Sequence, residues 1–232
     1  MLLKINGDIV SNEIKRLINE LKEWGFLITG DYFAPMDLVD AFNQMPEGDR
    51  LEIKINSGGG DVLAAQEMYT MLRGRNDFDI EIESLAASAA SVIAMSGHST
   101  ISPVGMLMIH DVSTYGVCGN HQDMEAAAKE LKMWDKALAG AYVAKTGKTE
   151  DEIIALMDKE TWLPAQKAVE LGFIDEISDG QSAKKMLAAS FSGIYQKAAD
   201  IREQYAKVKA ERESREAEKQ EILSDLDKFG AH

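Results

Sequence analysis

The chain has 232 residues, of which 45% are hydrophobic, enough to bury one sizeable core in a globular domain that carries a tail. Its formal net charge of -14 argues against nucleic acid as a partner, because nucleic-acid affinity comes largely from Lys and Arg that displace counterions. Cys118 is the single cysteine, which excludes an intramolecular disulfide, and no Cys and His spacing indicates a zinc site.

The sequence predicts neither a signal peptide nor a membrane span. Lys4 lies inside an amino-terminal apolar run that is too short for a signal peptide, and nowhere do ~18 apolar residues follow one another. Together with the single cysteine, this pattern favours a protein of the reducing cytoplasm.

Strand and helix patterns alternate from residue 51 onward. Apolar and charged residues alternate at first, as in a half-buried strand, and helical spacing follows after three glycines. The predicted elements are a strand at 51–55, a glycine turn at 58–60, a helix at 61–72, a strand at 78–82, a helix at 88–96, and short strands near 100 and at 106–110. Parallel α/β layering is the economical arrangement of such units.

The next segment predicts mostly helix. Residues 121–145 carry apolar side chains three or four positions apart with charges between them, which indicates a long amphipathic helix. A capping pattern at 149–152 starts a short helix, and another helix at 164–171 precedes a strand at 173–174.

Composition changes after about Ser190. Residues 201–229 are rich in Glu, Lys and Arg, lack Pro and Gly, and carry only a thin apolar series, so we expect a long charged helix. It is either a solvated helix or a coiled-coil or partner-docking segment, since so thin a stripe buries little alone. We place the domain boundary between residues 1–189 and a helical extension at 190–232.

Ser88 and His110 are the natural catalytic pair of this sequence. A serine hydroxyl is a weak nucleophile until a base accepts its proton, and the usual base is a histidine oriented by a carboxylate. Glycines 58–60 let backbone N–H groups approach a ligand, as an oxyanion hole requires. If Ser88 starts a helix, the N–H of Ala89 adds a second donor at the positive end of the helix dipole. A phosphate-binding turn is the weaker reading, because no Gly-Lys-Ser/Thr follows.

These residues belong to a series of motifs that resembles the ClpP-type serine peptidases (family S14), within the crotonase-like fold group. The series covers roughly residues 50–178 in the family's order. Its motifs are Ile-Asn-Ser-Gly-Gly-Gly at 55–60, where the family has Ile-Asn-Ser-Pro-Gly-Gly, Ala-Ala-Ser at 86–88, Met-Ile-His at 108–110, Trp-Leu-Pro-Ala at 162–165, and Ala-Val-Glu-Leu-Gly-Phe-Ile-Asp at 168–175.

The resemblance implies a serine endopeptidase with assigned roles. Ser88 would be the nucleophile, His110 the general base, and Gly60 and Ala89 the oxyanion donors. It implies no cofactor and no metal for this chain.

The carboxylate that completes the triad is assigned less directly by the resemblance. Glu160 stands two residues before Trp162, where the family usually has an aspartate, and Asp158 is the reserve candidate. Ser91 is a rival nucleophile, because Ala-Ala-Ser occurs twice, although it lies three residues further along the predicted helix.

The resemblance also implies a fold and an assembly. The fold would be an α/β, ClpP/crotonase-like arrangement of repeated β-β-α units, with 121–145 as the long handle-type helix and the charged helical tail behind it. Family members form homo-oligomeric rings whose active sites face an enclosed chamber and act on polypeptide substrates.

Within the family the chain most resembles the phage head maturation branch, through its opening at 5–10, its Glu-Thr-Trp-Leu at 160–163 and its acidic extension. Such an enzyme would cleave scaffold and capsid proteins in the host cytoplasm or in an assembling prohead. One alternative is the proteolytic subunit of an ATP-dependent Clp protease, supplied with unfolded chains by a separate AAA+ ATPase. Others are an inactive structural relative, which Glu160 and the charged tail would suit, and a CoA-binding hydratase, which would leave Ser88 and His110 without a purpose.

Overall fold

The computed structural model describes residues 1–178. The elements in chain order are β1 (Leu2–Ile9), α1 (Asn12–Glu23), β2 (Tyr32–Phe33), α2 (Pro35–Gln44), β3 (Leu51–Gly60), α3 (Val62–Arg73), β4 (Phe78–Ala87), α4 (Ala89–Ala94), β5 (Ser99–Ile101), β6 (Met106–Ile109), α5 (His121–Thr146), α6 (Glu150–Met157), β7 (Thr161–Pro164), α7 (Ala165–Glu170) and β8 (Glu176–Ile177). The predicted boundary at 189/190 and the predicted helical extension lie outside the described residues.

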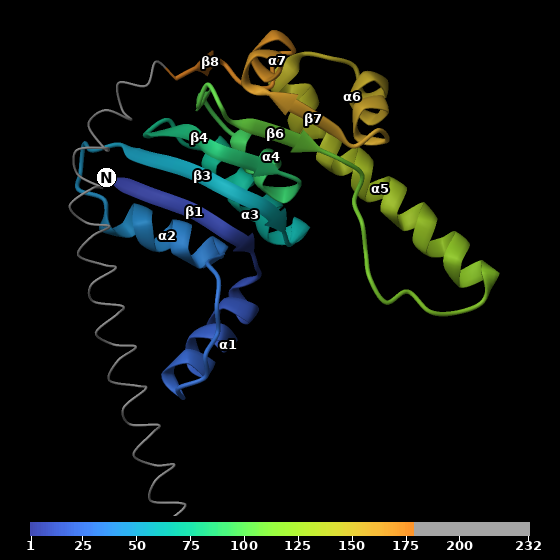
Figure 1. The fold of residues 1–232 in the computed structure, drawn as a ribbon, viewed down its shortest axis with the longest axis horizontal. Helices are drawn as coiled ribbons and strands as arrows, with labels where there is room; N and C mark the ends of the chain where they lie inside the picture. The colour runs from blue at the N-terminus through green and yellow to red at the C-terminus, as the bar shows by residue number, and fades with distance from the viewer. Residues whose placement is uncertain (179–232) are drawn as a thin grey trace, which may run out of the picture. The chain divides into compact units, whose positions relative to one another are not determined.

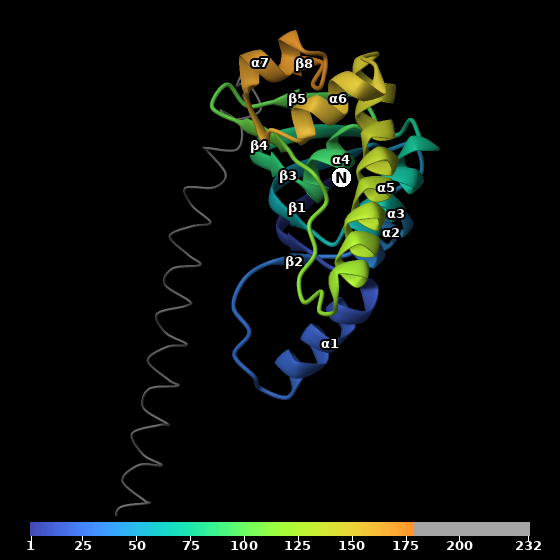
Figure 2. The same ribbon diagram turned by 90° about the vertical axis from the view of Figure 1, so that its right-hand side faces the viewer.

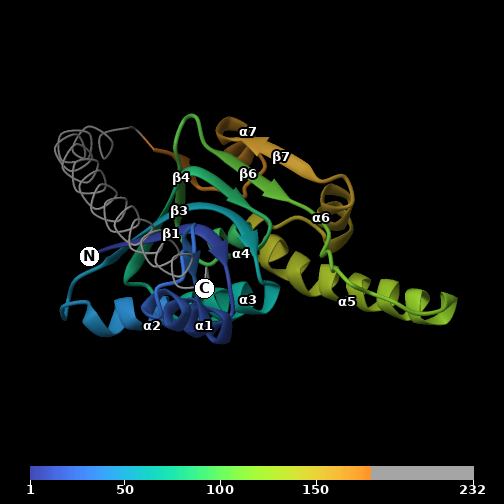
Figure 3. The ribbon, with the colours of Figure 1, turned by 60° about the horizontal axis from the view of Figure 1, so that its bottom comes forward.

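The strands form one sheet in the order β2-β1-β3-β4-β5-β8, and β6 pairs with β4 and β7. Within the described part of the chain every strand pair is parallel except β6 with β7. Helices connect the parallel strands, and α2 and α3 lie together along one side of the sheet (Figures 1 and 3). The predicted α/β class, with parallel strands connected by helices, is therefore confirmed.

The core lies between the sheet and these helices. Ile5 of β1, Ile55 of β3 and Ile82 of β4 are fully buried, and their register aligns them across the three strands. Met68, on α3, is also fully buried. Burying such side chains removes apolar surface from water at roughly 25 cal/mol per Å², which is the main force holding the layers together.

α5 (His121–Thr146) is the long helix that the periodicity predicts, and Asn120 and Gly147 cap its two ends. The Asn120 side chain accepts hydrogen bonds from the N–H groups of Gln122 and Asp123 and so caps the start. Gly147, with φ +70°, ends the helix in the left-handed conformation. Figures 1 and 2 show that its first turns project beyond the sheet, with the loop that follows β6 running beside them.

Four features differ from the sequence-based elements. β3 continues to Gly60, five residues beyond the predicted strand, so Gly59 and Gly60, which were expected in a turn, pair with Asp8 and Ile9 of β1. β1, α1, β2 and α2 precede residue 51, where we predicted no element; a bulge between Asn6 and Asp8 interrupts the alternating pattern of β1. β4 continues to Ala87, five residues beyond the predicted strand. The strand predicted at 173–174 is wrong, because the N–H groups of Phe173 and Ile174 both donate to the Ala168 carbonyl and the last strand, β8, starts at Glu176.

α1 differs from the other long helices in burying nothing. Ser11 caps its start by accepting from the Ile14 N–H, yet none of its residues is buried. No helix in residues 1–178 has both the length and the apolar content to cross a membrane.

Candidate active site

Ser88 lies at the junction between β4 and α4 in an unusual backbone conformation. Its φ of 53° and ψ of −126° are rare for a residue with a side chain and cost on the order of 1–3 kcal/mol. Its N–H donates to the Met108 carbonyl at 2.9 Å, which attaches the turn to β6. A serine on such a strained strand-to-helix turn presents its hydroxyl away from the sheet.

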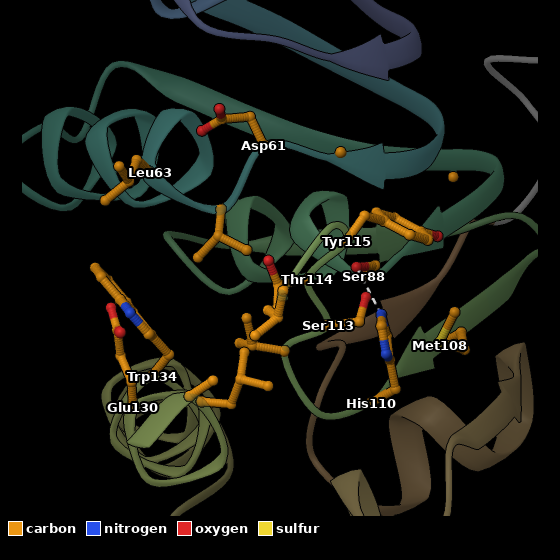
Figure 4. A pocket seen from close by; sticks show the side chains of 17 residues that line it. Asp61, Leu63, Ser88, Met108, His110, Ser113, Thr114, Tyr115, Glu130 and Trp134 are labelled. Atoms are coloured by element: carbon orange, nitrogen blue, oxygen red, sulfur yellow. Dashed lines mark hydrogen bonds between the residues drawn. The ribbon is translucent and has the colours of Figure 1, made fainter. Parts of the chain in front are cut away.

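Strand register brings His110 to Ser88. β4 and β6 run parallel with Ala87 opposite Met108, so the residues immediately following the two strands emerge at the same edge of the sheet. His110 Nε2 lies 2.8 Å from Ser88 Oγ, a hydrogen bond drawn as a dashed line in Figure 4. This is the contact that a general base needs in order to take the serine proton. The predicted pairing of the two side chains is therefore present in the structure.

The three glycines that end β3, for which the name glycine turn is kept, lie against both β1 and the Ser88 turn. A Cβ on Gly59, whose φ is +105°, would lie 2.7 Å from Ser88 Cβ and 3.0 Å from the Ala89 nitrogen. A Cβ on Gly60, whose φ is +142°, would lie 2.1 Å from the Ile9 carbonyl oxygen. Both positions therefore require glycine, and the turn approaches the start of α4, where Ala89 is located.

Ser57 holds this turn in place. Its hydroxyl donates to the Gly7 carbonyl at 2.6 Å and accepts from the Gly59 N–H at 3.1 Å. The hydroxyl thereby connects β1 to the glycines. The serine of the Ile-Asn-Ser-Gly-Gly-Gly motif thus fixes the position of the glycines that follow it.

Ser88, His110 and Gly60 line one cleft of about 730 Å³ (Figure 4). Its other walls come from the start of α3, the loop after β6 and one side of α5. Those lining residues are Gly58, Asp61, Val62, Leu63, Met108, Val112, Ser113, Thr114, Tyr115, Val117, Ala127, Glu130, Leu131 and Trp134. A mainly apolar cleft with a few polar groups near one another is the usual form of a ligand site.

Glu160 stands next to His110 in the strand register but does not contact it. β6 and β7 are antiparallel with Ile109 opposite Thr161, and one further step would place Glu160 opposite His110. The Glu160 carboxylate instead accepts from Trp162 Nε1 at 3.1 Å. Within residues 1–178 no carboxylate forms a hydrogen bond or ion pair with the His110 ring.

Asp158, the reserve candidate, lies in an acidic group close to the histidine. Burial first, and then the nearby carboxylates of Asp135 and Asp158, raise the pKa of Asp111, against the influence of the neighbouring His110. Asp135 is itself engaged, because it accepts from the Val112 N–H at 2.6 Å. Sequence reasoning missed Asp111 and Asp135, since no local pattern marks them as a group.

Ser91 is not placed to act as the rival nucleophile. It is fully buried, its hydroxyl donates to the Ser88 carbonyl at 2.6 Å, and Tyr142 Oη lies 2.7 Å from it. A serine without access to the cleft cannot attack a substrate there.

Within residues 1–178 no group of three or more His, Cys, Asp or Glu side chains is arranged to hold a metal ion. Cys118 is exposed, in the loop before α5.

Comparison with known proteins identifies the family. The family model described as Clp protease matches residues 37–181, more than half of the chain. The chain is 31% identical over 144 residues to the ATP-dependent Clp protease proteolytic subunit 1 of Corynebacterium glutamicum, covering 60% of this chain and 69% of that protein. It is 34% identical over 134 residues to the ATP-dependent Clp protease proteolytic subunit of Bacteroides fragilis, covering 56% of this chain and 64% of that protein. The chain therefore belongs to the Clp protease family of serine-type peptidases.

Proposed function

We propose that this chain is a serine endopeptidase in which Ser88 is the nucleophile, His110 the general base, and Gly60 and Ala89 the oxyanion donors. The observation that carries the proposal is the 2.8 Å contact between His110 Nε2 and Ser88 Oγ at the wall of the cleft. Glu160 remains the predicted carboxylate of the triad, supported by the register that continues to the position opposite His110.

The proposed reaction proceeds in two halves. Ser88 Oγ attacks the carbonyl carbon of the scissile peptide bond while His110 Nε2 takes its proton, and the resulting oxyanion accepts hydrogen bonds from the Gly60 and Ala89 N–H groups. His110 then protonates the leaving amine, which departs and leaves an acyl-enzyme. Water, deprotonated by His110, attacks the acyl carbonyl and releases the second product and the free Ser88 hydroxyl.

For the Glu160 carboxylate to orient the imidazole, its side chain has to exchange the Trp162 Nε1 partner for His110 Nδ1. Catalytic hydrogen bonds are often formed only in the substrate complex, so the present contact of Glu160 is compatible with that role.

The biological setting that fits the names of the relatives is a proteolytic subunit of a Clp protease. In this setting the chain forms a homo-oligomeric ring in the cytoplasm, and an AAA+ ATPase partner supplies unfolded polypeptides. The chain itself then needs no nucleotide.

A second setting is phage head maturation, in which the substrates are scaffold and capsid proteins. It is favoured by the amino-terminal part of the chain, because β1, α1 and β2 precede the residues that the family model matches and α1 buries none of its side chains. Such an enzyme would act without an ATPase.

The test of the active site is labelling with a fluorophosphonate, followed by peptide mapping by mass spectrometry. We expect label on Ser88 in the unmodified protein and in Ser113→Ala, a control that removes another serine of the same cleft. Ser88→Ala and His110→Ala should not be labelled. Absence of label from the unmodified protein, in whatever oligomeric state its native mass reveals, would favour the inactive structural relative instead.

The two settings are separated by the requirement for ATP. Cleavage of a folded scaffold or capsid protein by the isolated oligomer would support head maturation. Cleavage of short peptides alone, with folded proteins degraded only after addition of an AAA+ ATPase and ATP, would support the Clp subunit.

A further inference from the structure

We propose that Ser91 and Tyr142 are positioning residues, which hold the peptide unit between Ser88 and Ala89 so that its N–H can serve in the oxyanion hole. This inference rests on the proposed function, because it assigns a role to the surroundings of the Ser88 nucleophile. It concerns two buried hydroxyls that the mechanism above does not use.

The Ser88 carbonyl is held by two donors from the same residue. The Ser91 N–H lies 2.9 Å from the Ser88 oxygen, and Ser91 Oγ lies 2.6 Å from it. A hydroxyl has one proton and a carbonyl oxygen can only accept. Ser91 Oγ therefore donates its proton to the Ser88 carbonyl oxygen. The hydrogen bond of 2.7 Å between Ser91 Oγ and Tyr142 Oη must then be donated by Tyr142.

Burial keeps this chain of hydroxyls in one arrangement. Ser91 is fully buried and Tyr142 is 2% exposed, so neither hydroxyl has water as an alternative partner. Burial raises the pKa of Tyr142 above its ordinary value, although the hydrogen bond with Ser91 opposes the shift, and the phenol therefore remains a protonated donor. Tyr142 is itself packed against Phe173, with ring centroids 5.9 Å apart.

The anchored carbonyl determines the direction of the next N–H. A peptide unit is planar and trans, so its C=O and N–H point in opposite directions. Fixing the Ser88 oxygen towards Ser91 therefore directs the Ala89 N–H to the opposite side of the peptide unit. The glycine turn lies close to this nitrogen, since a Cβ on Gly59 would be 3.0 Å from it. Donation to the carbonyl also polarises the peptide unit and strengthens its N–H as a donor.

The hydrogen bonds that Ser91 donates to the Ser88 carbonyl, called the anchor below, hold Ser88 in an unfavourable backbone conformation. The φ of 53° at Ser88 is unfavourable for a serine, and a peptide next to a strained residue rotates unless its surroundings hold it. Ser91, three residues further in the chain, and Tyr142, on α5, supply that hold.

The experiment measures the rate of Ser88 phosphonylation by a fluorophosphonate, the kcat and KM for a fluorogenic peptide, and the melting temperature. The variants are Ser91→Ala, Tyr142→Phe and the double variant. Removing one oxyanion donor outright lowers rates by about 10²–10³-fold, and Ser91→Ala keeps the backbone bond from its N–H, so we expect a loss of ~10-fold or more in kcat and in labelling, with KM little changed. Tyr142→Phe should lower both rates less.

The double variant separates positioning from mere stability. Ser91→Ala leaves a buried phenol without a partner and lowers the melting temperature, whereas removing both hydroxyls relieves that penalty. We therefore expect the double variant to regain stability while its kcat and labelling rate stay as low as those of Ser91→Ala, because Tyr142 acts through Ser91. Rates that follow the melting temperature across the three variants would overturn the inference.

Ser96→Ala is the matched control. Ser96 is another buried serine next to the end of α4, and its hydroxyl donates to the Ile93 carbonyl at 2.7 Å, away from Ser88. Ser96→Ala should lose stability without a decrease in the labelling rate of Ser88.

Label on Ser88 at the unmodified rate in Ser91→Ala would refute the anchor and leave the proposed function intact. No label on Ser88 in the unmodified protein would refute the proposed function itself.

Discussion

Backbone strain in this protein is concentrated where the sequence predicts catalysis. Among residues 1–178, Ser88 and Glu160 are the two non-glycine residues with positive φ, at 53° and 48°. Strained conformations cost free energy and persist where the surroundings enforce them, which makes them more frequent at functional sites. Both residues flank His110, one through a hydrogen bond and the other through the strand register.

Glu160 can be tested by removing only its charge. We expect Glu160→Gln to lower kcat by ~10²-fold or more, because an amide can hold imidazole in the wrong tautomer and cannot stabilise imidazolium. Asp158→Asn is the matched control and should leave kcat close to that of the unmodified protein. Steady-state kinetics with a fluorogenic peptide provides the measurement. A larger loss of kcat in Asp158→Asn than in Glu160→Gln would assign the role of triad carboxylate to Asp158.

Asp111 should make stability depend on pH. Because its pKa is raised in the folded protein, by burial first and then by the carboxylates of Asp135 and Asp158, the folded state keeps a proton that the unfolded state releases. The contribution of this residue to stability is therefore present at low pH and is lost as pH rises from about 4, the ordinary aspartate pKa, through the raised value.

Asp111→Asn should accordingly gain stability relative to the unmodified protein as pH increases over that interval. Urea unfolding at a series of pH values from 4 to neutral checks this sign. A stability difference that is the same at every pH would contradict it.

At the scale of elements, the cleft depends on where α5 passes. Its residues Ala127, Leu131 and Trp134 line the wall that faces the Ser88 turn, whereas Met133, one residue before the tryptophan, is 59% exposed. The amphipathic pattern of α5 thus separates a cleft side from a solvent side along the same helix.

Trp134→Ala should weaken peptide binding more than it slows the chemical step. Removing the indole takes away apolar surface that a bound side chain can cover, and a loss of about 1.4 kcal/mol raises KM ~10-fold. Met133→Ala serves as the control, since its side chain lies outside the cleft. Equal changes of KM in both variants would indicate that α5 contributes to binding only through its general stability.

At the scale of the whole molecule, one carboxylate joins three segments that are distant in the chain. Asp175, just before β8, accepts from the Ser99 N–H at 2.7 Å and from Lys145 Nζ on α5. Lys145 Nζ also donates to the Gly97 carbonyl at 2.7 Å. These bonds attach the end of the described chain to the sheet and to α5.

Asp175→Asn should therefore lower stability without affecting catalysis. Burial alone would raise the pKa of Asp175, but the hydrogen bonds from Lys145 and Ser99 hold it below the ordinary value, so its contribution is present at neutral pH and is lost in acid. At neutral pH we expect a decrease of ~1–2 kcal/mol in the free energy of unfolding and an unchanged rate of Ser88 labelling. Glu176→Gln, at an exposed neighbouring position, is the control for changing a charge at this edge.

The sequence by itself determined the elements and residues that carry strong local signals. The glycine turn at 58–60, the serine at the start of an apolar helix and the histidine ending an apolar strand each stand out within a few residues, because turn chemistry and periodicity are local properties. The predicted range of 121–145 agrees with α5 to within one residue for the same reason, since the helical spacing of apolar side chains is also a local signal.

Only the tertiary structure decided which of these residues meet. Ser88 approaches His110 through the register of β4 and β6, and Tyr142 reaches Ser91 across 51 residues of chain. Non-local packing likewise determines the partner of Glu160 and the acidic group around Asp111. It also buries Ser91 away from the cleft. A one-dimensional pattern predicts which side of an element is buried, whereas the packing of distant segments determines what that side contacts.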